Sequence, residues 1–370
     1  MKNEEEILCL SWCDADDVMN YGQILQGCAM MYILRQLTDG VIRYVSFFPR
    51  GLKRKVKYLL KHYNPFSGHL FAYLRSKRII DSFIHHYNIQ FYQISKERKL
   101  EAISRNAHYI LCGSDQIWHP QNYDKIYFLN FGSKNAKRIS FAASLPKTKV
   151  EKQYVNEYQK MKLDLAKFNL ISVREAQSCE FITELSGLSV SSVLDPTYLV
   201  DEMIWEEYIE NIDVPDQYIF VYIPNGMDEN MLILVNKIKE EMGISNVFVM
   251  ITRGKSYFND FKELNFVSVG QFLYLIKQAA CVVTSSFHAV VFSTIFHREF
   301  WCYDVPNKIR GEDVRLIDLL KKLKLEDRRI DMKKFIDISE MIDYKSVDNI
   351  ISEEKCKSIE FLKEALEYDI

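Results

Sequence analysis

The feature that most constrains the fold of this chain is a repeated alternation of short apolar runs with longer amphipathic stretches. Short runs of β-branched and small apolar residues indicate buried parallel strands, and apolar residues at helical spacing indicate the helices between them. The first block has apolar runs at 7–10, 109–112, 138–142, 170–173 and 190–194, and the second at 218–223, 247–251, 266–269, 280–284 and 300–303. This pattern predicts an α/β chain with two Rossmann-like, doubly wound parallel sheets.

The same pattern predicts how the chain divides into domains. Helical spacing indicates helices over residues 22–37, 174–185 and 352–368, and Asp195-Pro196 ends the regular pattern of the first block. We expect an N-terminal domain over residues 1–200, a C-terminal domain over residues 201–345, and an amphipathic helix over residues 346–370 that can pack back on the first domain. Because open α/β sheets bind ligands outside the carboxyl ends of their strands, we expect a ligand in a cleft between the domains.

Composition limits the classes of protein and partner. The 370 residues include 48% apolar side chains, enough for two cores, and the net charge of −2 gives no general attraction to nucleic acid. The eight cysteines form no CxxC pair and no cluster of zinc type, which indicates a reducing, cytoplasmic setting without a metal. The acidic start is unlike a signal peptide, and no apolar run approaches the ~20 residues that span a bilayer. We expect a soluble or peripheral protein, in the cytoplasm or at the inner face of the membrane.

One strand end of the second block has the features of a reactive site. The apolar run 280–283 leads into Thr284, Ser285 and Ser286, whose hydroxyls predict the N-terminus of a helix with His288 in its first turn. Backbone N–H groups and the helix dipole favour an anion there, and a histidine can transfer a proton near neutral pH. The alternative is a satisfied core histidine. We favour a site, because this is the position at which such sheets bind ligands.

Two loops of the first block carry polar groups that packing does not require. Residues 113–118 follow a predicted strand, and residues 20–23 precede the first long helix. Asp115 can accept a proton, Trp118 offers a flat face of the kind that stacks on a sugar ring, and Gly22 lets the backbone approach a ligand closely. For each loop the alternative is a cap on the next helix.

Arg174 follows the apolar run 170–173 directly, so we expect its guanidinium to emerge at a strand end. There its fork of donors could bind a carboxylate or a phosphate bidentately. The alternative is a surface ion pair with Glu175 or Glu180.

Several of these segments belong to a set of six motifs that occur in a characteristic order. The motifs are Asn20-Tyr21-Gly22-Gln23-Ile24-Leu25-Gln26, Gly113-Ser114-Asp115-Gln116-Ile117-Trp118, Ser140-Phe141-Ala142-Ala143-Ser144, Ser172-Val173-Arg174-Glu175, Leu194-Asp195-Pro196-Thr197 and Ser286-Phe287-His288-Ala289. In their order and spacing the chain resembles the polysaccharide pyruvyl transferase family, from about residue 8 to about residue 330. The resemblance implies a GT-B-like fold and transfer of a pyruvyl group from phosphoenolpyruvate to two hydroxyls of one sugar as a cyclic ketal, in surface or capsular polysaccharide biosynthesis.

The resemblance also implies the residues that contact the donor. These are Arg174, His288 and Lys308, with Ser285 and Ser286 beside them. Many relatives have an arginine where this chain has Ser286, and many have an aspartate where it has Gln23. The donor needs counter-charges for a carboxylate and a phosphate, and its carbon-3 must gain a proton before a hydroxyl can attack carbon-2. We expect His288 to give that proton and Asp115 to accept the proton of the attacking hydroxyl.

No step of this reaction needs a metal or a cofactor, and phosphoenolpyruvate is the donor substrate. The residues expected to bind the sugar acceptor are those of the two polar loops, Asn20, Tyr21, Gly22, Gln23, Ser114, Gln116 and Trp118. The main alternative is a GT-B glycosyltransferase with a nucleotide-sugar donor, and a further one is an inactive binding protein of the same fold.

A basic region near residues 50–80 suggests where the acceptor resides. No Asp or Glu occurs between Gly40 and Ile80, where ten Lys or Arg residues lie among apolar ones. A basic helical insertion with an apolar face suits an anionic membrane surface or a lipid-linked oligosaccharide acceptor. The alternative is an ordinary solvated helix pair. We expect no nucleic-acid partner, and the sequence does not indicate an oligomeric state.

Overall fold

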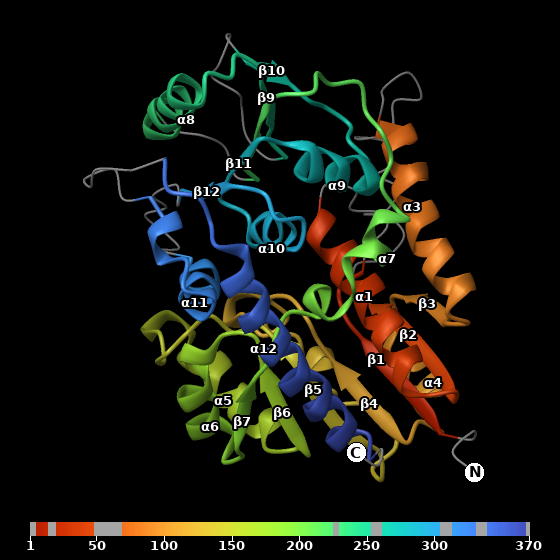
Figure 1. Ribbon diagram of the computed structural model, residues 1–370. Coiled ribbons are helices and arrows are strands. Elements are labelled where there is room, and N and C mark those ends of the chain that lie inside the picture. The colour runs from red at the N-terminus through yellow and green to blue at the C-terminus, as the bar shows by residue number, and fades with distance from the viewer. Residues whose placement is uncertain are drawn as a thin grey trace. The chain divides into compact units, whose positions relative to one another are not determined.

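The structure is a computed structural model that describes residues 5–13, 20–47, 69–224, 229–252, 261–303, 313–330 and 339–367 (Figure 1). The chain divides into two compact units. Unit 1 contains residues 1–67, 77–200 and 353–370, and unit 2 contains residues 68–76 and 201–352. Each unit has its own parallel sheet.

The sheet of unit 1 has seven strands in the order β3-β2-β1-β4-β5-β6-β7, and all neighbours are parallel. The strands are β1 (Glu6–Leu10), β2 (Val41–Phe47), β3 (Gln90–Ile94), β4 (Tyr109–Cys112), β5 (Lys137–Ala143), β6 (Leu170–Val173) and β7 (Val190–Ser192). The five predicted strands are confirmed. The apolar pattern does not reveal β2, which Arg43 and Ser46 interrupt, or the edge strand β3, in which only Ile94 is buried.

Helices cover both faces of this sheet. The strand order reverses at β1, so right-handed crossovers place α1 on one face and α5 and α6 on the other. The helices are α1 (Tyr21–Leu37), α3 (His69–His86), α4 (Glu97–Ser104), α5 (Val155–Leu165), α6 (Cys179–Ser186) and α12 (Tyr344–Ala365). Both α3 and α12 contribute residues to both units. The helix predicted from residue 174 begins only at Cys179, and α12 begins eight residues before the predicted 352–368 segment.

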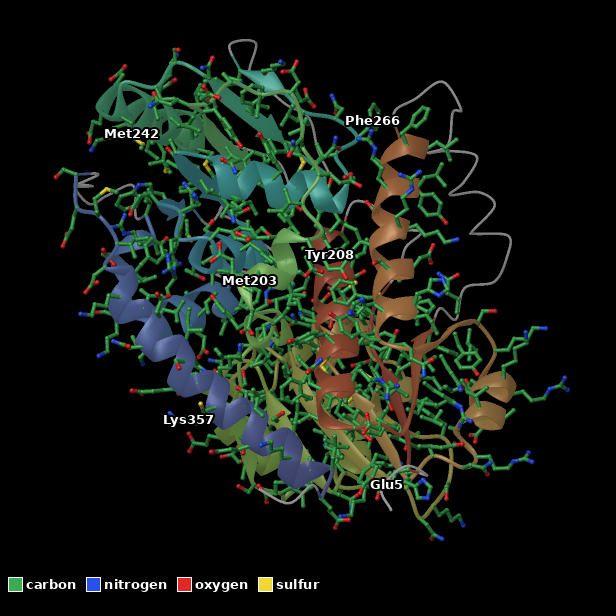
Figure 2. All side chains as sticks on the ribbon, turned by 45° about the vertical axis from the view of Figure 1, so that its right-hand side comes forward. Glu5, Met203, Tyr208, Met242, Phe266 and Lys357 are labelled. Atoms are coloured by element: carbon green, nitrogen blue, oxygen red, sulfur yellow. The ribbon has the colours of Figure 1, made fainter. Side chains whose placement is uncertain are left out.

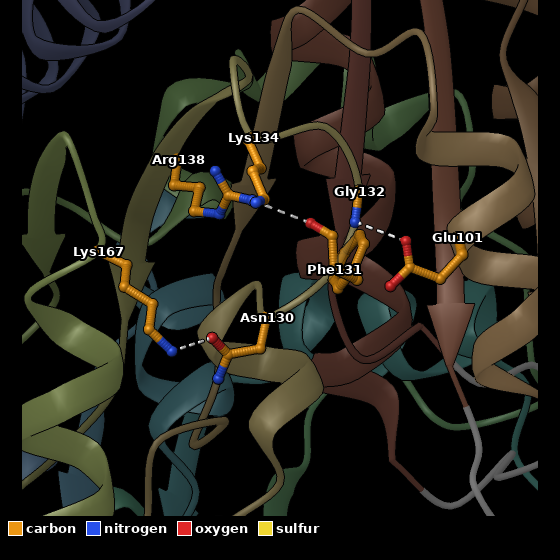
Figure 3. Close-up of a pocket in the computed structure, with 7 residues that line it drawn as sticks. All are labelled: Glu101, Asn130, Phe131, Gly132, Lys134, Arg138 and Lys167. Atoms are coloured by element: carbon orange, nitrogen blue, oxygen red, sulfur yellow. Dashed lines mark hydrogen bonds between the residues drawn. The ribbon is translucent and has the colours of Figure 1, made fainter.

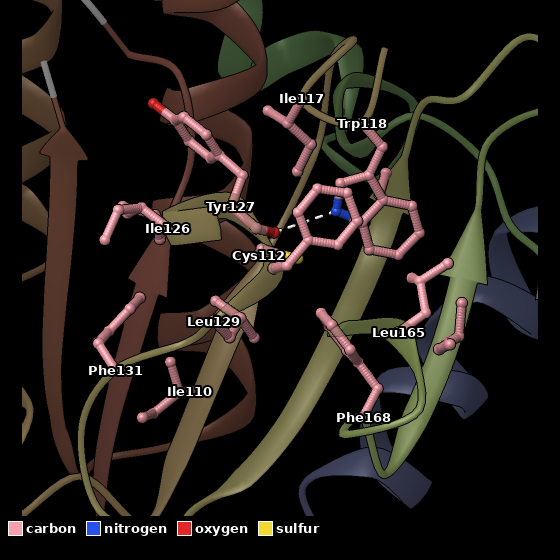
Figure 4. Close-up of a cluster of buried hydrophobic side chains, with 14 of the residues drawn as sticks. Ile110, Cys112, Ile117, Trp118, Ile126, Tyr127, Leu129, Phe131, Leu165 and Phe168 are labelled. Carbon is pink, nitrogen blue, oxygen red and sulfur yellow. Dashed lines mark hydrogen bonds between the residues drawn. The ribbon is translucent and has the colours of Figure 1, made fainter. Parts of the chain in front are cut away.

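One hydrophobic cluster of the unit 1 core includes residues of α4, α5 and α6 and of the loop after β4. Trp118 lies in it without exposed surface (Figure 4). Its ring stacks on Phe128 with centroids 5.6 Å apart and meets Phe168 edge to face at the same distance. A tryptophan packed on two aromatic rings excludes water from this part of the core.

The sheet of unit 2 has five parallel strands in the order β10-β9-β8-β11-β12. The strands are β8 (Ile219–Tyr222), β9 (Val247–Met250), β10 (Lys262–Glu263), β11 (Cys281–Thr284) and β12 (Phe300–Cys302), and the helices are α7 (Glu202–Glu206), α8 (Glu229–Met242), α9 (Val269–Gln278), α10 (Phe287–Ile295) and α11 (Val314–Leu323). Four of the five predicted strands are confirmed.

The strand predicted over residues 266–269 is wrong. Phe266, labelled in Figure 2, has a φ of +60°, which a strand does not allow. Ser268 instead caps α9, because its Oγ accepts from the N–H of Gln271 while the Gln271 side chain accepts from the N–H of Ser268. The apolar residues of this segment therefore introduce a helix, and β10 lies a few residues earlier.

The strand order reverses between β1 and β4 in unit 1 and between β8 and β11 in unit 2. Loops that leave the carboxyl ends of strands at such a reversal form the ligand crevice of an open α/β sheet. Within the described ranges, no helix is both long and apolar enough to cross a membrane.

Candidate active site

Polar side chains gather at the reversal point of unit 1, and Gln26 of α1 connects them. Gln26 has no exposed surface. Its Nε2 donates to Oγ of Ser11 at 2.9 Å and to the carbonyl of Gln23 at 3.1 Å, and its Oε1 accepts from the N–H of Ser114 at 3.2 Å. Gln26 therefore joins the segment after β1, helix α1 and the loop after β4.

The loop after β4 holds Asp115 in an unusual backbone conformation. Its φ is +72°, and Ala142 in the neighbouring strand has a φ of +54°, both in the left-handed region that non-glycine residues rarely adopt. The carbonyl of Asp115 accepts from the N–H of Ser144 at 2.9 Å, and its Oδ1 accepts from the N–H of Gln116 at 2.7 Å. Strained residues of this kind concentrate at functional sites. The loop thus fixes the direction of the Asp115 carboxylate.

Gly113 makes this loop possible. A Cβ atom at Gly113 would lie 1.8 Å from the carbonyl oxygen of Phe141, and the φ of +144° also favours glycine. The next residue, Ser114, donates its Oγ to the carbonyl of Ala142 at 3.0 Å and to Oδ2 of Asp195 at 3.1 Å. The loop is therefore fastened to β5 and to the segment after β7.

A buried ion-pair network continues from Asp195 across the ends of β6 and β7. Nη1 of Arg174 lies 2.7 Å from Oδ2 of Asp195, and its Nε lies 3.3 Å from Oε1 of Glu175. Ser144 donates to the same Glu175 oxygen at 2.7 Å. Asp195 Oδ1 accepts from the N–H and the hydroxyl of Thr197, at 3.1 and 2.7 Å, where the 3-10 helix η5 (Pro196–Leu199) begins.

Arg174 is therefore a buried residue rather than an exposed fork at a strand end. It exposes 4% of its surface, and Glu175 and Asp195 each expose 1%. The ion pair with Glu175 that we considered as the alternative is present, although it is buried, and Asp195 is a second carboxylate partner. A donor anion that reached Arg174 would compete with two carboxylates for one guanidinium.

The residues predicted to bind the acceptor fall into a partly exposed group and a buried group. Asn20, Gln23 and Gln116 are partly exposed. Oδ1 of Asn20 accepts from the N–H of Gln23 at 3.4 Å, so the cap that we considered as the alternative is present. The buried group consists of Tyr21, Gly22, Ser114 and Trp118.

The expectation that Trp118 presents a face to a sugar does not agree with the structure. Its indole has no exposed surface, and its Nε1 donates to the carbonyl of Tyr127 at 3.0 Å. Three residues after Asp115 the chain has already turned back into the core, where both ring faces are packed. The role of Trp118 in this structure is to anchor the end of the loop.

The reversal point of unit 2 carries the predicted strand-to-helix turn. Thr284 ends β11, donates its Oγ1 to the carbonyl of Tyr222 at the end of β8 at 2.6 Å, and accepts from the N–H of Ser286 at 3.0 Å. Helix α10 begins at Phe287, and the Ser286 side chain at its N-cap makes no capping hydrogen bond. His288 lies in the first turn, is 8% exposed, and meets the Phe287 ring edge to face at 5.2 Å.

This turn can accommodate an anion next to the imidazole of His288. Ser285 and Ser286 are partly exposed, so their hydroxyls can contact a ligand at the N-terminus of α10. The dipole of α10 favours negative charge at that end. Lys308, the third residue expected at the donor, lies outside the described residues.

The polar network includes residues that our sequence analysis did not assign to a site. Gln26, Glu175 and Asp195 occur in the quoted motifs, but nothing in their spacing indicated that they are buried and joined. A signal was available, because a polar residue directly follows β1, β5 and β6 and is the second residue after β4. In parallel strands these positions meet at one edge of the sheet.

The cysteines near the reversal point of unit 1 are not suited to act as nucleophiles. Burial raises the pKa of the Cys9, Cys28 and Cys112 thiols well above the usual range, so each stays protonated. Among the described residues, no group of three or more His, Cys, Asp or Glu side chains could hold a metal ion.

A surface pocket of unit 1 lies near the amino end of β5 (Figure 3). Arg138 lines it and donates to the carbonyls of Leu129, Ala136, Phe131 and Ser133, at 3.0 to 3.1 Å. Lys167 in the same pocket donates to Asn130 and to Asp164. Arg138 and Lys167 are thus already paired within the protein. The pocket lies at the amino ends of the strands, whereas the polar residues described above lie at the carboxyl ends.

Comparison with known families gives a match over most of the chain. The family model described as polysaccharide pyruvyl transferase matches residues 20–307. That range includes both reversal points and the polar residues at them. No curated protein matches the chain significantly.

Two solved structures with a similar fold contain UDP or UDP-GlcNAc. The UDP-GlcNAc 2-epimerase of Neisseria meningitidis bound to UDP-GlcNAc is similar with a TM-score of 0.52 and 8% identity, over 99% of this chain and 100% of that one. The S. aureus MnaA–UDP structure is similar with a TM-score of 0.53 and 9% identity, over 99% and 98%. At such identities the likeness shows the fold alone, and the prediction of two Rossmann-like domains of GT-B type is confirmed.

Proposed function

Because this chain belongs to the polysaccharide pyruvyl transferase family, we propose that it transfers a pyruvyl group from phosphoenolpyruvate to two hydroxyls of one sugar, as a cyclic ketal. The acceptor is a precursor of a surface or capsular polysaccharide, and transfer takes place in the cytoplasm or at the inner face of the membrane. The observation that carries the proposal is the family match over residues 20–307, which covers Asp115, Arg174 and His288.

We assign the binding site of phosphoenolpyruvate to the turn before α10. Phosphoenolpyruvate carries a carboxylate and a phosphate, and the N-terminus of α10 with the hydroxyls of Ser285 and Ser286 provides donors for an anion. Arg174 and Lys308 are the proposed counter-charges. For Arg174 this requires that the donor share the guanidinium with Asp195 or displace that carboxylate.

The reaction that we assign to His288 and Asp115 has two stages, and every proton is accounted for in them. His288 gives a proton to carbon-3, one sugar hydroxyl attacks carbon-2, and Asp115 accepts the proton of that hydroxyl. The bond from carbon-2 to the phosphate oxygen then breaks, the second hydroxyl attacks carbon-2, and its proton leaves with the phosphate. The products are the cyclic ketal and inorganic phosphate, with no electron transfer.

The acceptor is assigned to the partly exposed polar groups of unit 1. Asn20, Gln23 and Gln116 can donate to or accept from sugar hydroxyls, and Asp115 next to Gln116 provides the base. Buried Ser114 and Gln26 act on the acceptor only by holding this loop. A lipid-linked oligosaccharide is the acceptor class that best suits the basic region of the sequence near residues 50–80.

The test compares donors directly with the purified full chain. Calorimetry with phosphoenolpyruvate, UDP and GDP, followed by mass spectrometry of a panel of lipid-linked and soluble saccharides, should show binding and consumption of phosphoenolpyruvate with release of phosphate. The product should gain one pyruvate less one water. Binding of UDP or GDP with transfer of a sugar, and no response to phosphoenolpyruvate, would instead identify a GT-B glycosyltransferase.

A further inference from the structure

Helix α3 exposes an apolar and basic surface on the side opposite to its buried stripe. Phe71 is 65% exposed and Leu74 is 44% exposed, although both are large apolar side chains. Arg75, Arg78 and His85 are also exposed and lie at helical spacing from them. We call Phe71, Leu74, Arg75, Lys77 and Arg78 the α3 surface.

The buried stripe of α3 accounts for its fold, so the α3 surface is not needed for packing. Ala72, Ile79, Ile80 and Phe83 are 0–4% exposed and recur at helical spacing. Ser76 on the same stripe accepts from the N–H of Val269 at 3.0 Å. Phe71 and Leu74, on the opposite side of the helix, are therefore free to contact a binding partner.

The charge of the α3 surface is positive and is not neutralised within the part of the chain that the structure describes. Arg75, Lys77 and Arg78 take part in no hydrogen bond or ion pair among the described residues. Asp81 is the single acidic residue of α3. The sequence on the N-terminal side adds to the positive charge, because no Asp or Glu occurs from Gly40 to Ile80. The side chains of α3 can be followed in Figure 2, where this helix comes forward.

We propose that the α3 surface binds an anionic lipid bilayer, with Phe71 and Leu74 inserted at the level of the headgroups and the basic side chains paired with lipid phosphates. Charge complementarity selects this occupant. A soluble polyanion would pair with the cations but would offer nothing to the exposed apolar side chains between them, whereas an anionic bilayer pairs with the cations and buries the apolar side chains. The inference rests on the proposed function only in that a lipid-linked acceptor would be met at the same membrane.

The test measures vesicle binding, which requires neither donor nor acceptor. The full chain should co-float with phosphatidylcholine vesicles that contain phosphatidylglycerol and not with vesicles of phosphatidylcholine alone, and raised salt should weaken the binding. The partition coefficient of the variant Arg75→Glu/Lys77→Glu/Arg78→Glu onto these vesicles should fall by roughly 100-fold or more, because each basic residue near an anionic surface contributes about 1 kcal/mol. Phe71→Ser/Leu74→Ser should weaken the binding that survives in high salt.

The matched control applies the same charge change in and just before helix α5 of unit 1. Lys152, Lys160 and Lys162 are exposed there, next to the 71% exposed Leu163, and their change to glutamate should leave vesicle binding within about twofold of wild type. Equal losses in both triple variants would show that only net charge matters and would overturn the proposal. Binding of inorganic polyphosphate without any vesicle binding would overturn it too, in favour of a soluble polyanion.

A turnover assay separates this inference from the proposed function. The α3 triple variant should retain wild-type turnover on a water-soluble acceptor and lose turnover on an acceptor embedded in vesicles. Loss on the soluble acceptor as well would assign the α3 surface to the active site and contradict membrane docking. A chain that binds vesicles but never consumes phosphoenolpyruvate would contradict the proposed function alone.

Discussion

Oδ2 of Asp195 lies 2.7 Å from Nη1 of Arg174, and neither residue exposes more than 4% of its surface. The same carboxylate accepts from Ser114 and from Thr197, so it joins the loop after β4 to the ends of β6 and β7. A buried ion pair contributes little net stability when intact but is costly to break, because the remaining charge stays buried. The loop that carries Asp115 is therefore tied to the Arg174–Asp195 pair.

Asp195→Asn should destabilise the protein by about 3–5 kcal/mol, because the buried guanidinium of Arg174 loses one of its two carboxylate partners. The amide of Asn can still cap η5, so the cap is not the cause of the loss. Denaturant unfolding measures this. The control is Asp313→Asn, since Asp313 also caps a helix and pairs with an arginine, Arg315, but both side chains are about one-fifth exposed. The control should cost less than about 1 kcal/mol. Equal costs at the two sites would mean that the buried network is not tightly held.

Gln26→Leu should destabilise the protein by about 1–3 kcal/mol, because the N–H of Ser114 would lose its acceptor in a site without water access. Gln23→Leu, on the same helix but partly exposed, should change stability by less than about 0.5 kcal/mol. If Gln23 contacts the sugar, Gln23→Leu should raise the KM for the acceptor more than Gln26→Leu does. A stability loss in Gln23→Leu as large as in Gln26→Leu would contradict this division of roles.

The sequence predicted the strands well where a buried strand is a continuous apolar run. β4, β6 and β11 are of this kind, with every residue apolar or small. It failed at β3, which is an edge strand with polar residues, and at 266–269, where apolar residues precede a capped helix rather than form a strand. Apolar character alone does not identify either case, because β3 has no apolar run and the capping hydrogen bonds of Ser268 and Gln271 make 266–269 the start of a helix.

For the candidate site residues, the sequence indicated the place in the fold but not the burial. The strand-to-helix turn at His288 follows from an apolar run and three hydroxyl residues, which are local signals. By contrast, the partner of Arg174 is 21 residues away in the chain, and Asp195 reaches it only because β6 and β7 are neighbours in the sheet. Trp118 likewise packs on Phe168, 50 residues later. No local pattern contains such contacts.

Trp118→Ala should destabilise the protein by about 3–5 kcal/mol, because it removes a side chain that packs on two rings in the core. Trp118→Phe should cost less, since it retains apolar volume and loses the hydrogen bond to Tyr127. Thermal or denaturant unfolding gives both values. If Trp118→Phe instead left stability unchanged and raised the KM of the acceptor, the indole would have to leave the core and contact the sugar during turnover.

Under the proposed function, His288 gives the proton that carbon-3 of phosphoenolpyruvate gains. His288→Gln should retain much of the phosphoenolpyruvate affinity, because an amide can occupy the first turn of α10 and still form hydrogen bonds. It should lose turnover by about 10²- to 10⁴-fold, since an amide has no transferable proton near neutral pH. That loss corresponds to about 3–5 kcal/mol in the activation barrier. Calorimetry and single-turnover kinetics separate the two effects.

His297→Gln is the matched control for this change in the same unit. His297 is 47% exposed on its side chain and pairs with Asp348 at 2.9 Å, away from the turn before α10, so its loss should leave turnover unchanged. Near-normal turnover in His288→Gln would assign the proton to Asp115 or another acid. A loss of donor affinity equal to the loss of rate would instead make His288 a ligand of the donor, because binding and chemistry would then depend on it to the same extent.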